Sequence, residues 1–271
     1  MGAKPVTLTQ AELDRCRRTA VRAALASGRV LRRYFTRPLR HLSKPDSSIV
    51  TVADRESEQV CRKILGSTGI PLDFLGEESG YRPHETLSVG RWIVDPLDGT
   101  TNFIHSFPMF CVSIGLEIRG VLVLGVIYQP ITRELFIAEK GRGARRNGKK
   151  IHVSRVATLE RALLSTGFST SRDGLLRSEL QAFEKLSVRS QGVRRPGAAA
   201  LDLAYTACGL FDGFWENGLS PWDVAAGTLL VTEAGGRVTE FDGRTYRLGS
   251  RGIVASNRRI HGALLPILRR I

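Results

Sequence analysis

Acidic residues gather in three short segments, and each segment follows or opens an apolar stretch. Glu77 and Glu78 follow Phe-Leu-Gly at 74–76, residues 95–101 (Asp-Pro-Leu-Asp-Gly-Thr-Thr) follow Trp-Ile-Val, and Asp223 opens an Ala/Gly-rich segment. Taken singly, each segment is typical of a turn or of a solvated charged pair. Together they predict a site for hard divalent cations, because clustered carboxylates repel one another unless a cation neutralises them.

Residues 95–101 have the spacing of a metal and phosphate cradle. Asp95 and Asp98 flank the backbone carbonyl of Leu97, and residues 99–102 are predicted to begin a helix with free N–H groups. Two magnesium ions that share a carboxylate would activate a water and stabilise a leaving alkoxide, which predicts phosphate-ester hydrolysis. An EF-hand is excluded, because Pro96 and Leu97 stand where that loop needs oxygen ligands in alternation.

Three motifs in this order and spacing resemble the inositol monophosphatase family. They are Gly-Glu-Glu at 76–78, Trp-Ile-Val-Asp-Pro-Leu-Asp-Gly-Thr-Thr-Asn-Phe at 92–103 and Pro-Trp-Asp-Val-Ala-Ala-Gly at 221–227. The resemblance covers nearly the whole chain and continues through residues 50–54, 198–202 and 232–236. It implies an α/β fold, namely the five-layer α/β/α/β/α sandwich of the inositol monophosphatase and fructose bisphosphatase type.

The resemblance also implies a set of magnesium ligands. Glu77, Asp95 and the Leu97 carbonyl would hold a first ion, and Asp95, Asp98 and Asp223 would hold a second. A third ion, more weakly bound, is implied beside Glu77. The expected cofactor is therefore Mg²⁺, with two ions as the working number and three as the alternative.

Catalytic and substrate roles follow from the same resemblance. Thr100, with Asp54 behind it, is expected to orient and deprotonate the attacking water, and Glu77 is the third expected catalytic residue. The amides of Gly99 and Thr100 would hold the phosphate. The polyol end of the substrate would be lined by four residues, namely Asp98, Ala199, Glu216 and Asp223.

Two positions depart from the family pattern. Ser48 stands where many members carry an acidic residue, which predicts an altered cation environment near Lys44. Ser220 stands where animal members have histidine, so the rim of the substrate site is expected to differ. Both departures concern selectivity more than chemistry.

Composition restricts the class of protein. Of 271 residues, 42% are hydrophobic and 24% charged, which are globular proportions and exclude a disordered tail or a coiled coil. The longest apolar run, residues 120–128, is too short to span a membrane, and no signal peptide is visible. Four scattered cysteines without C-x-x-C spacing predict reduced, packed thiols, and hence a cytoplasmic protein.

Periodicity predicts two helices and then an antiparallel meander. Apolar spacing from 13 to 35 predicts a long helix, with Thr9 and Glu12 in the order of a capping box, and residues 52–65 predict a second helix after a turn at 44–50. Alternating β-branched residues predict strands, closed by a hairpin turn at Asn147-Gly148, over 111–117, 121–128 and 134–138.

After residue 154, predicted strands and helices alternate, which indicates layered α/β structure. Strands are expected at 163–167, 213–216, 237–241 and 252–255, and helices near 175–186, near 199–208 and from 222. We expect two sub-domains with a soft boundary. Residues 1–155 would form an α+β sub-domain with most metal ligands, and residues 156–271 an α/β sub-domain that supplies Asp223 and substrate contacts.

The sequence therefore predicts a magnesium-dependent phosphomonoesterase for a small polyol phosphate, with inositol 1-phosphate as the first candidate. Glu216 favours a hydroxyl-bearing ligand, since a carboxylate accepts hydroxyl hydrogen bonds and repels a second phosphate. Histidinol phosphate, fructose 1,6-bisphosphate and 3′-phosphoadenosine 5′-phosphate remain alternatives. The family also suggests a homodimer and inhibition by lithium. The net charge of +14 leaves a rival class open, an RNA- or transcription-machinery-binding protein, which is less favoured.

Overall fold

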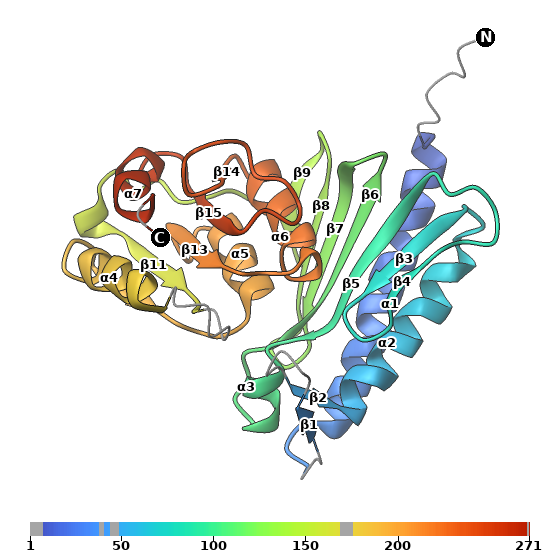
Figure 1. Ribbon diagram of the computed structural model, residues 1–271. Helices are drawn as coiled ribbons and strands as arrows, with labels where there is room; N and C mark the ends of the chain where they lie inside the picture. Colours follow the sequence, from blue (N-terminus) through green and yellow to red (C-terminus); the bar gives the residue numbers. More distant parts are fainter. Residues whose placement is uncertain (1–7, 38–40, 44–48, 169–175, 270) are drawn as a thin grey trace.

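The computed structural model describes residues 8–37, 41–43, 49–168, 176–269 and 271. Their helices and two main sheets, of eight and five strands, stack in five layers (Figure 1). On the outer face of the larger sheet lie α1 (Gln10–Tyr34) and α2 (Val52–Leu65), and the middle layer holds α5 (Ala199–Ala207) and α6 (Pro221–Glu233). The smaller sheet forms the next layer, and α4 (Leu176–Ser187) and α7 (His261–Leu268) form the last layer, packed against that sheet. The predicted α/β/α/β/α sandwich is confirmed.

The first two helices begin where capping chemistry predicts. The amide of Thr9 donates to Glu12 Oε2 (2.8 Å), and the Glu12 amide donates to Thr9 Oγ1 (3.3 Å), which closes the capping box of α1. Thr51 and Asp54 form the same motif at the start of α2. Asp54 is itself a predicted site residue, so the cap of α2 also fixes the position of this side chain.

The prediction of a turn at 44–50 is wrong for its last two residues, 49 and 50. Residues Ile49–Thr51 form β2, which pairs antiparallel with β1 (His41–Ser43). A β-branched run, Ile-Val-Thr, favours this extended structure. Residues 44–48, with Lys44 and the unusual Ser48, lie outside the described residues, so the expectation about a changed cation environment stays a prediction.

The larger sheet has eight strands in the order β10-β9-β8-β7-β6-β5-β3-β4, and only β3 and β5 run parallel. The predicted meander is confirmed, and so is the turn at Asn147-Gly148, where both residues have positive φ (48° and 79°). The strands are β3 (Leu72–Gly76), β4 (Gly80–Arg82), β5 (Gly90–Asp98), β6 (Cys111–Ile118), β7 (Val121–Gln129), β8 (Glu134–Glu139), β9 (Gly143–Arg146) and β10 (Lys149–Ile151).

The smaller sheet has five strands in the order β12-β11-β13-β15-β14, with β11 parallel to both of its neighbours. Its strands are β11 (Leu163–Thr166), β12 (Gly192–Arg194), β13 (Gly213–Asn217), β14 (Arg237–Thr239) and β15 (Gly252–Ser256). The short helices η1 (Gly66–Thr68), α3 (Thr100–Ile104) and η2 (Leu159–Arg161) complete the described fold. The chain leaves the first sheet after Ile151 and enters the second at Leu163, and the division at residue 155 remains a prediction.

Small residues let α6 lie directly on the larger sheet. A Cβ atom added to Gly115 would lie 2.8 Å from Ala225 Cβ, and one added to Gly125 would lie 2.7 Å from the Ala226 carbonyl. We call these contacts the glycine seam. Since only glycine permits so close an approach, the seam fixes the helix that carries Asp223 against β6 and β7.

The described residues also give the state of the cysteines and the lengths of the helices. All four cysteines are free thiols, three of them buried. Over the described ranges, none of the helices has the length and hydropathy needed to cross a bilayer.

Candidate active site

Two of the carboxylates predicted to bind metal, those of Asp95 and Asp98, lie on either side of an irregularity in β5. Asp95 pairs with Ser113 of β6, but the next pair is Asp98 with Cys111, so the register shifts between the two carboxylates. In a regular strand, residues three apart point to opposite faces. The register shift is a bulge, which changes the direction of the side chains beside it. Asp95 and Asp98 are both buried, with 2% and 8% of their surface exposed.

Four predicted ligands interact strongly through their charges. Burial raises the pKa of Asp95 well above its usual range, and the negative charges of Glu77, Asp98 and Asp223 raise it further. Burial likewise raises the pKa of Asp98 to about 8, with Asp223 as the next cause. Glu77 follows β3, where its amide donates to the Val94 carbonyl (3.2 Å) of β5. The fold therefore brings carboxylates from β3, β5 and α6 into one electrostatic cluster.

The cluster is not a preformed cage. In the part of the chain that the structure describes, no group of three or more His, Cys, Asp or Glu side chains meets the geometry of a metal site. What fits magnesium is the donor chemistry, since the cluster offers carboxylate oxygens, the ligands that hard cations prefer. Mutual repulsion of these groups also means that a cation would stabilise their ionised forms. The individual ligand assignments stay predictions.

Thr100 and Asp54 are in contact, as the sequence predicts for a pair that handles water. The Thr100 hydroxyl lies 3.1 Å from Asp54 Oδ1 and 3.0 Å from the Leu97 carbonyl, and either oxygen can accept its proton. Asp54 is fully buried, and its Oδ2 accepts bonds from the amide (2.8 Å) and hydroxyl (2.6 Å) of Thr51. Burial raises the pKa of Asp54, although the bonds from Thr51 and Thr100 lower it. The contact between Thr100 and Asp54 is therefore present, and its role in handling water stays a prediction.

Gly99 forms the turn between β5 and α3. Its φ is +90°, and an added Cβ would lie 2.8 Å from the Met109 carbonyl, so both backbone angle and space require glycine. Asn102 holds this turn against the second half of the chain, with its Nδ2 2.7 Å from the Met109 carbonyl and 2.8 Å from the Pro196 carbonyl. The predicted helix at 99–102 is confirmed as the five-residue α3.

Asp98 also ties the first sheet to α5. Ala198, the N-cap of α5, makes no side-chain cap, and the Ala200 amide instead donates to Asp98 Oδ2 (2.8 Å). This bond favours the ionised carboxylate and places a negative charge at a helix N-terminus, where it is stabilised. Ala199, a predicted substrate contact, is 6% exposed beside it.

Glu216 enters the same electrostatic cluster from the smaller sheet. It lies on β13, where burial raises its pKa to about 8, and the charges of Asp223 and Asp98 add to the shift. Arg195 acts in the opposite direction and lowers that pKa. Gly167 makes room for the carboxylate, because a Cβ at that position would lie 2.1 Å from Glu216 Oε1.

Asp223 lies in the first turn of α6. Its Oδ2 accepts a bond from the Ser220 amide (2.7 Å), and Pro221 occupies the first helical position. Ser220 therefore acts through its backbone at the start of α6. Because the glycine seam fixes the same helix to β6 and β7, Asp223 is held from both the loop and the sheet.

Several residues of this region were not predicted from the sequence. Asn102 and Gly167 act through contacts with residues distant in the chain, which no local pattern encodes. Asp202 is fully buried, and its pKa is raised by burial, by Glu216 and by Asp98. Its motif, Ala-Ala-Ala-Leu-Asp at 198–202, does not by itself indicate a role for the aspartate.

Comparisons with known proteins agree with this fold and these motifs. The profile of the inositol monophosphatase family matches residues 12–271. An inositol-1-monophosphatase of Mesorhizobium japonicum is 42% identical over 252 residues, which cover 92% of this chain and 94% of that protein. The Nus factor SuhB of Pseudomonas aeruginosa is 42% identical over 255 residues, with the same two coverages.

A solved structure is similar as well. The crystal structure of the extragenic suppressor protein suhB from Bartonella henselae has a TM-score of 0.89 and 41% identity, and the match covers 93% of this chain and 98% of that one.

The fold and the acidic cluster together define a phosphatase of the metal-dependent kind. The chain belongs to the inositol monophosphatase family. It is accordingly a phosphoric monoester hydrolase, acting on small phosphate monoesters.

Proposed function

We propose that this protein hydrolyses a small polyol phosphate, with inositol 1-phosphate as the first candidate, in a reaction that depends on two magnesium ions. The observation that carries the proposal is the charge cluster of Glu77, Asp95, Asp98 and Asp223. Within it, burial and the charges of the other three members raise the pKa of Asp95, and burial and the charges of Asp223 and Glu77 raise that of Asp98. Such a cluster is costly without a cation. Its oxygen donors match magnesium rather than zinc.

In this proposal, Glu77, Asp95 and the Leu97 carbonyl hold one ion, and Asp95, Asp98 and Asp223 hold the second. A third ion, held less tightly beside Glu77, is an extension of the same proposal. When bound, magnesium supplies Lewis acidity that favours a nucleophilic water and a leaving alkoxide. The protein's own task is to keep four carboxylates from three elements in fixed positions, which the β5 bulge and the glycine seam achieve.

Proton movement is assigned to Thr100 and Asp54, with Glu77 as a further base near the water. The Thr100 hydroxyl can accept the proton of an attacking water as it passes its own to Asp54 Oδ1, 3.1 Å away. Burial raises the pKa of Asp54, so the carboxyl is a stronger base than an exposed aspartate. The amides of Gly99 and Thr100 are proposed to hold the phosphate.

Substrate selection is assigned to the polyol end. Asp98, Ala199, Glu216 and Asp223 are proposed to line it, and Glu216 accepts hydroxyl hydrogen bonds there. Cations that neutralise Asp98 and Asp223 remove two causes of the raised pKa of Glu216 and so favour its ionised form. A second phosphate near the ionised Glu216 would meet a repelling charge, which disfavours fructose 1,6-bisphosphate and 3′-phosphoadenosine 5′-phosphate. Histidinol phosphate remains the strongest competitor, because its ammonium suits a carboxylate. Relatives are named inositol-1-monophosphatase, which supports the first candidate.

A phosphate-release assay of the purified protein tests the proposal. Inositol 1-phosphate, histidinol phosphate, fructose 1,6-bisphosphate and 3′-phosphoadenosine 5′-phosphate are compared with and without magnesium. We expect the highest kcat/KM for inositol 1-phosphate and no turnover after exhaustive chelation. Turnover that survives chelation would refute the two-metal proposal, and a preference for another substrate would refute only the substrate assignment.

A second candidate function is contact with RNA or the transcription machinery. It is favoured by the name Nus factor SuhB, given to relatives from Pseudomonas aeruginosa and Salmonella typhimurium, and by the net charge of +14. A nucleic-acid face predicts an affinity that falls steeply with salt. Titration of a fluorescent RNA at several salt concentrations tests it, and weak binding at physiological salt would argue against it.

Three further properties belong to the same proposal. We infer a homodimer and inhibition by lithium from family membership, and a cytoplasmic location from the four free thiols. Sedimentation of the purified protein measures the first. Lithium inhibition that is uncompetitive with respect to substrate would support the second, and a lack of response at high lithium would contradict it.

A further inference from the structure

A cavity lies along the C-terminal half of α6, whereas Asp223 lies in the first turn of this helix. The cavity has a volume of about 560 Å³. Its walls come from the start of β5, the β6–β7 turn, α6 and the loop before β15. None of the predicted catalytic, metal or substrate residues lines it, although burial and then the charge of Asp223 raise the pKa of Tyr246 in its wall.

Positive charge at this cavity is incompletely neutralised. Arg91 is paired with Glu117 of the neighbouring strand (Nε to Oε2 2.5 Å), and Glu233 accepts bonds from the amides of Gly141 and Gly143 (both 2.8 Å). Within the described ranges, neither the Lys140 ammonium nor the Arg247 guanidinium has an ion pair or hydrogen bond. These two cations and the charge of Glu233 leave one net positive charge at the cavity.

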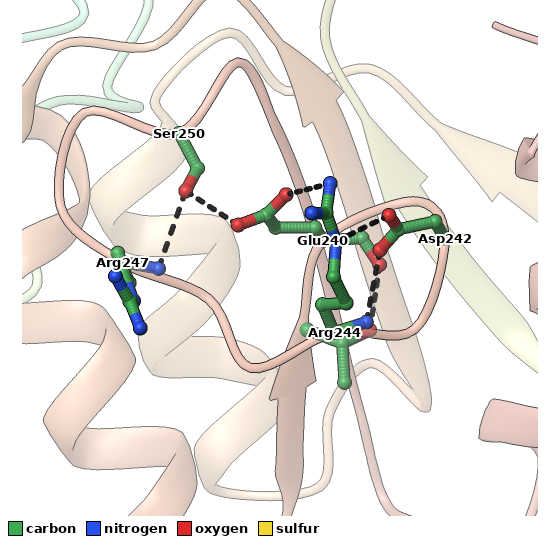
Figure 2. A network of polar contacts seen from close by, with 6 residues as sticks. Glu240, Asp242, Arg244, Arg247 and Ser250 are labelled. Atoms are coloured by element: carbon green, nitrogen blue, oxygen red, sulfur yellow. Dashed lines mark hydrogen bonds and ion pairs between the residues drawn. The ribbon is translucent and has the colours of Figure 1, made fainter.

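Arg247 is free for a ligand because its neighbours in the loop satisfy one another. Figure 2 shows Arg244 bound to Asp242 and Glu240, and Ser250 bound to Glu240, while the guanidinium of Arg247 points away from this network. Only the backbone amide of Arg247 takes part, donating to Ser250 Oγ (3.3 Å). The network therefore fixes the loop and leaves the Arg247 side chain at the mouth of the cavity.

The inner wall of the cavity is apolar but carries two unused hydroxyl groups. Tyr246 is 9% exposed and packs in the same cluster as Leu229 and Leu248. Its hydroxyl, like that of Thr228, is buried and has no partner among the described residues. Buried polar groups are nearly always hydrogen-bonded, because leaving one unpaired costs free energy. These two hydroxyl groups are therefore available as hydrogen-bond donors to a molecule bound in the cavity.

We propose that this cavity is a second ligand site, which takes a small organic monocarboxylate with an apolar body. The carboxylate would meet Lys140 and Arg247, and the apolar body would contact Leu229 and Leu248. A monoanion neutralises the single net positive charge, whereas a dianion would exceed it. Tyr246 and Thr228 would donate to the ligand after small shifts of the wall. The site shares α6 with Asp223, so its occupant would contact the helix that carries a predicted metal ligand.

Calorimetric titration of the full chain with sodium 1-naphthoate tests the proposal, with neutral 1-naphthamide as the matched probe. We expect one naphthoate site per chain, much weaker binding of the amide, and the same naphthoate affinity with magnesium and saturating inorganic phosphate. Competition by magnesium and phosphate, or equal binding of the amide, would overturn the proposal. The readout is heat of binding, so it is independent of phosphatase activity.

A pair of variants places the ligand at this cavity. Arg247→Ala is expected to weaken naphthoate binding at least about fivefold, since it removes a charge-assisted hydrogen bond. Arg244→Ala makes the same change of net charge in the same loop, but its guanidinium is held by Asp242 and Glu240, so affinity should not change. Equal losses in both variants, or no loss in Arg247→Ala, would overturn the proposal. Leu229→Trp, which fills the cavity from α6, should abolish binding, and retained binding would overturn it too.

Discussion

Asp98 should make the stability of the metal-free protein depend on pH in an unusual direction. Burial, followed by the charge of Asp223, raises its pKa from 3.8 to about 8 in the folded chain. A raised pKa means that the folded state keeps a proton that the unfolded chain has already lost. The stabilisation that the Asp98 carboxyl contributes is therefore complete at low pH and is lost as the pH rises through 8.

The size of the effect follows from linkage. Between pH 6 and pH 8, the free energy of unfolding of the metal-free protein should fall by about 2 kcal/mol on account of Asp98, since one pKa unit is worth about 1.4 kcal/mol. For a chain of this length, that is a fall in Tm of about 4 °C. Magnesium favours the ionised carboxylate, so its stabilising effect should be larger at pH 8 than at pH 6.

Asp98→Asn is the matched control, because asparagine keeps an acceptor for the Ala200 amide and removes the titration. Thermal unfolding in EDTA and in magnesium is measured at pH 6, 7 and 8 for both proteins. Between pH 6 and pH 8, the free energy of unfolding of the metal-free variant should fall by about 2 kcal/mol less than that of the wild type. The variant should also lose most phosphatase activity. Parallel curves for the two metal-free proteins would refute the reasoning.

Three further changes test particular contacts. His261 is buried, and burial lowers its pKa to about 4, so the unfolded chain gains a proton first as the pH falls. The free energy of unfolding should therefore drop by up to about 3 kcal/mol between pH 6.5 and 4. His261→Asn should flatten this pH dependence in urea titrations. Gly167→Ala should displace the Glu216 carboxylate and raise KM for the polyol phosphate more than for an aryl phosphate; equal changes would give Gly167 a purely structural role. Asn102→Ala should cost about 1 kcal/mol in unfolding experiments because it leaves partly buried carbonyls unpaired, and an unchanged Tm would contradict the clamp between α3 and the loop before α5.

Local chemistry made much of this fold predictable. Thr9 and Glu12 mark the start of α1 because a capping box satisfies the free amides of a helix, and Asn147-Gly148 marks a hairpin because both positions need positive φ. In both cases the determining interactions lie within a few residues. The order of acidic motifs was equally visible, since three separated segments fit one arrangement of carboxylates.

Interactions between distant segments could not be predicted in the same way. Pairing of β2 with β1, and the parallel pairing of β3 with β5, depend on which segments meet in space. The site shows the same limit. Gly167 is required only because Glu216 lies against it, and the pKa of Asp98 reflects Asp223, far along the chain. Without the tertiary contacts, neither environment is visible in the order of residues.

The glycine seam between α6 and the larger sheet has a consequence for changing the specificity of this enzyme. Gly115 and Gly125 leave no space for a side chain, so α6 cannot be re-angled by substituting the residues beneath it. Glu216 and Arg195 lie on the smaller sheet and the loop after β12, away from this contact. If Glu216 contacts substrate as proposed, libraries aimed at new phosphate monoesters should vary the smaller sheet and its loops and leave the seam untouched. The molecule separates a part that tolerates no redesign from a part open to it.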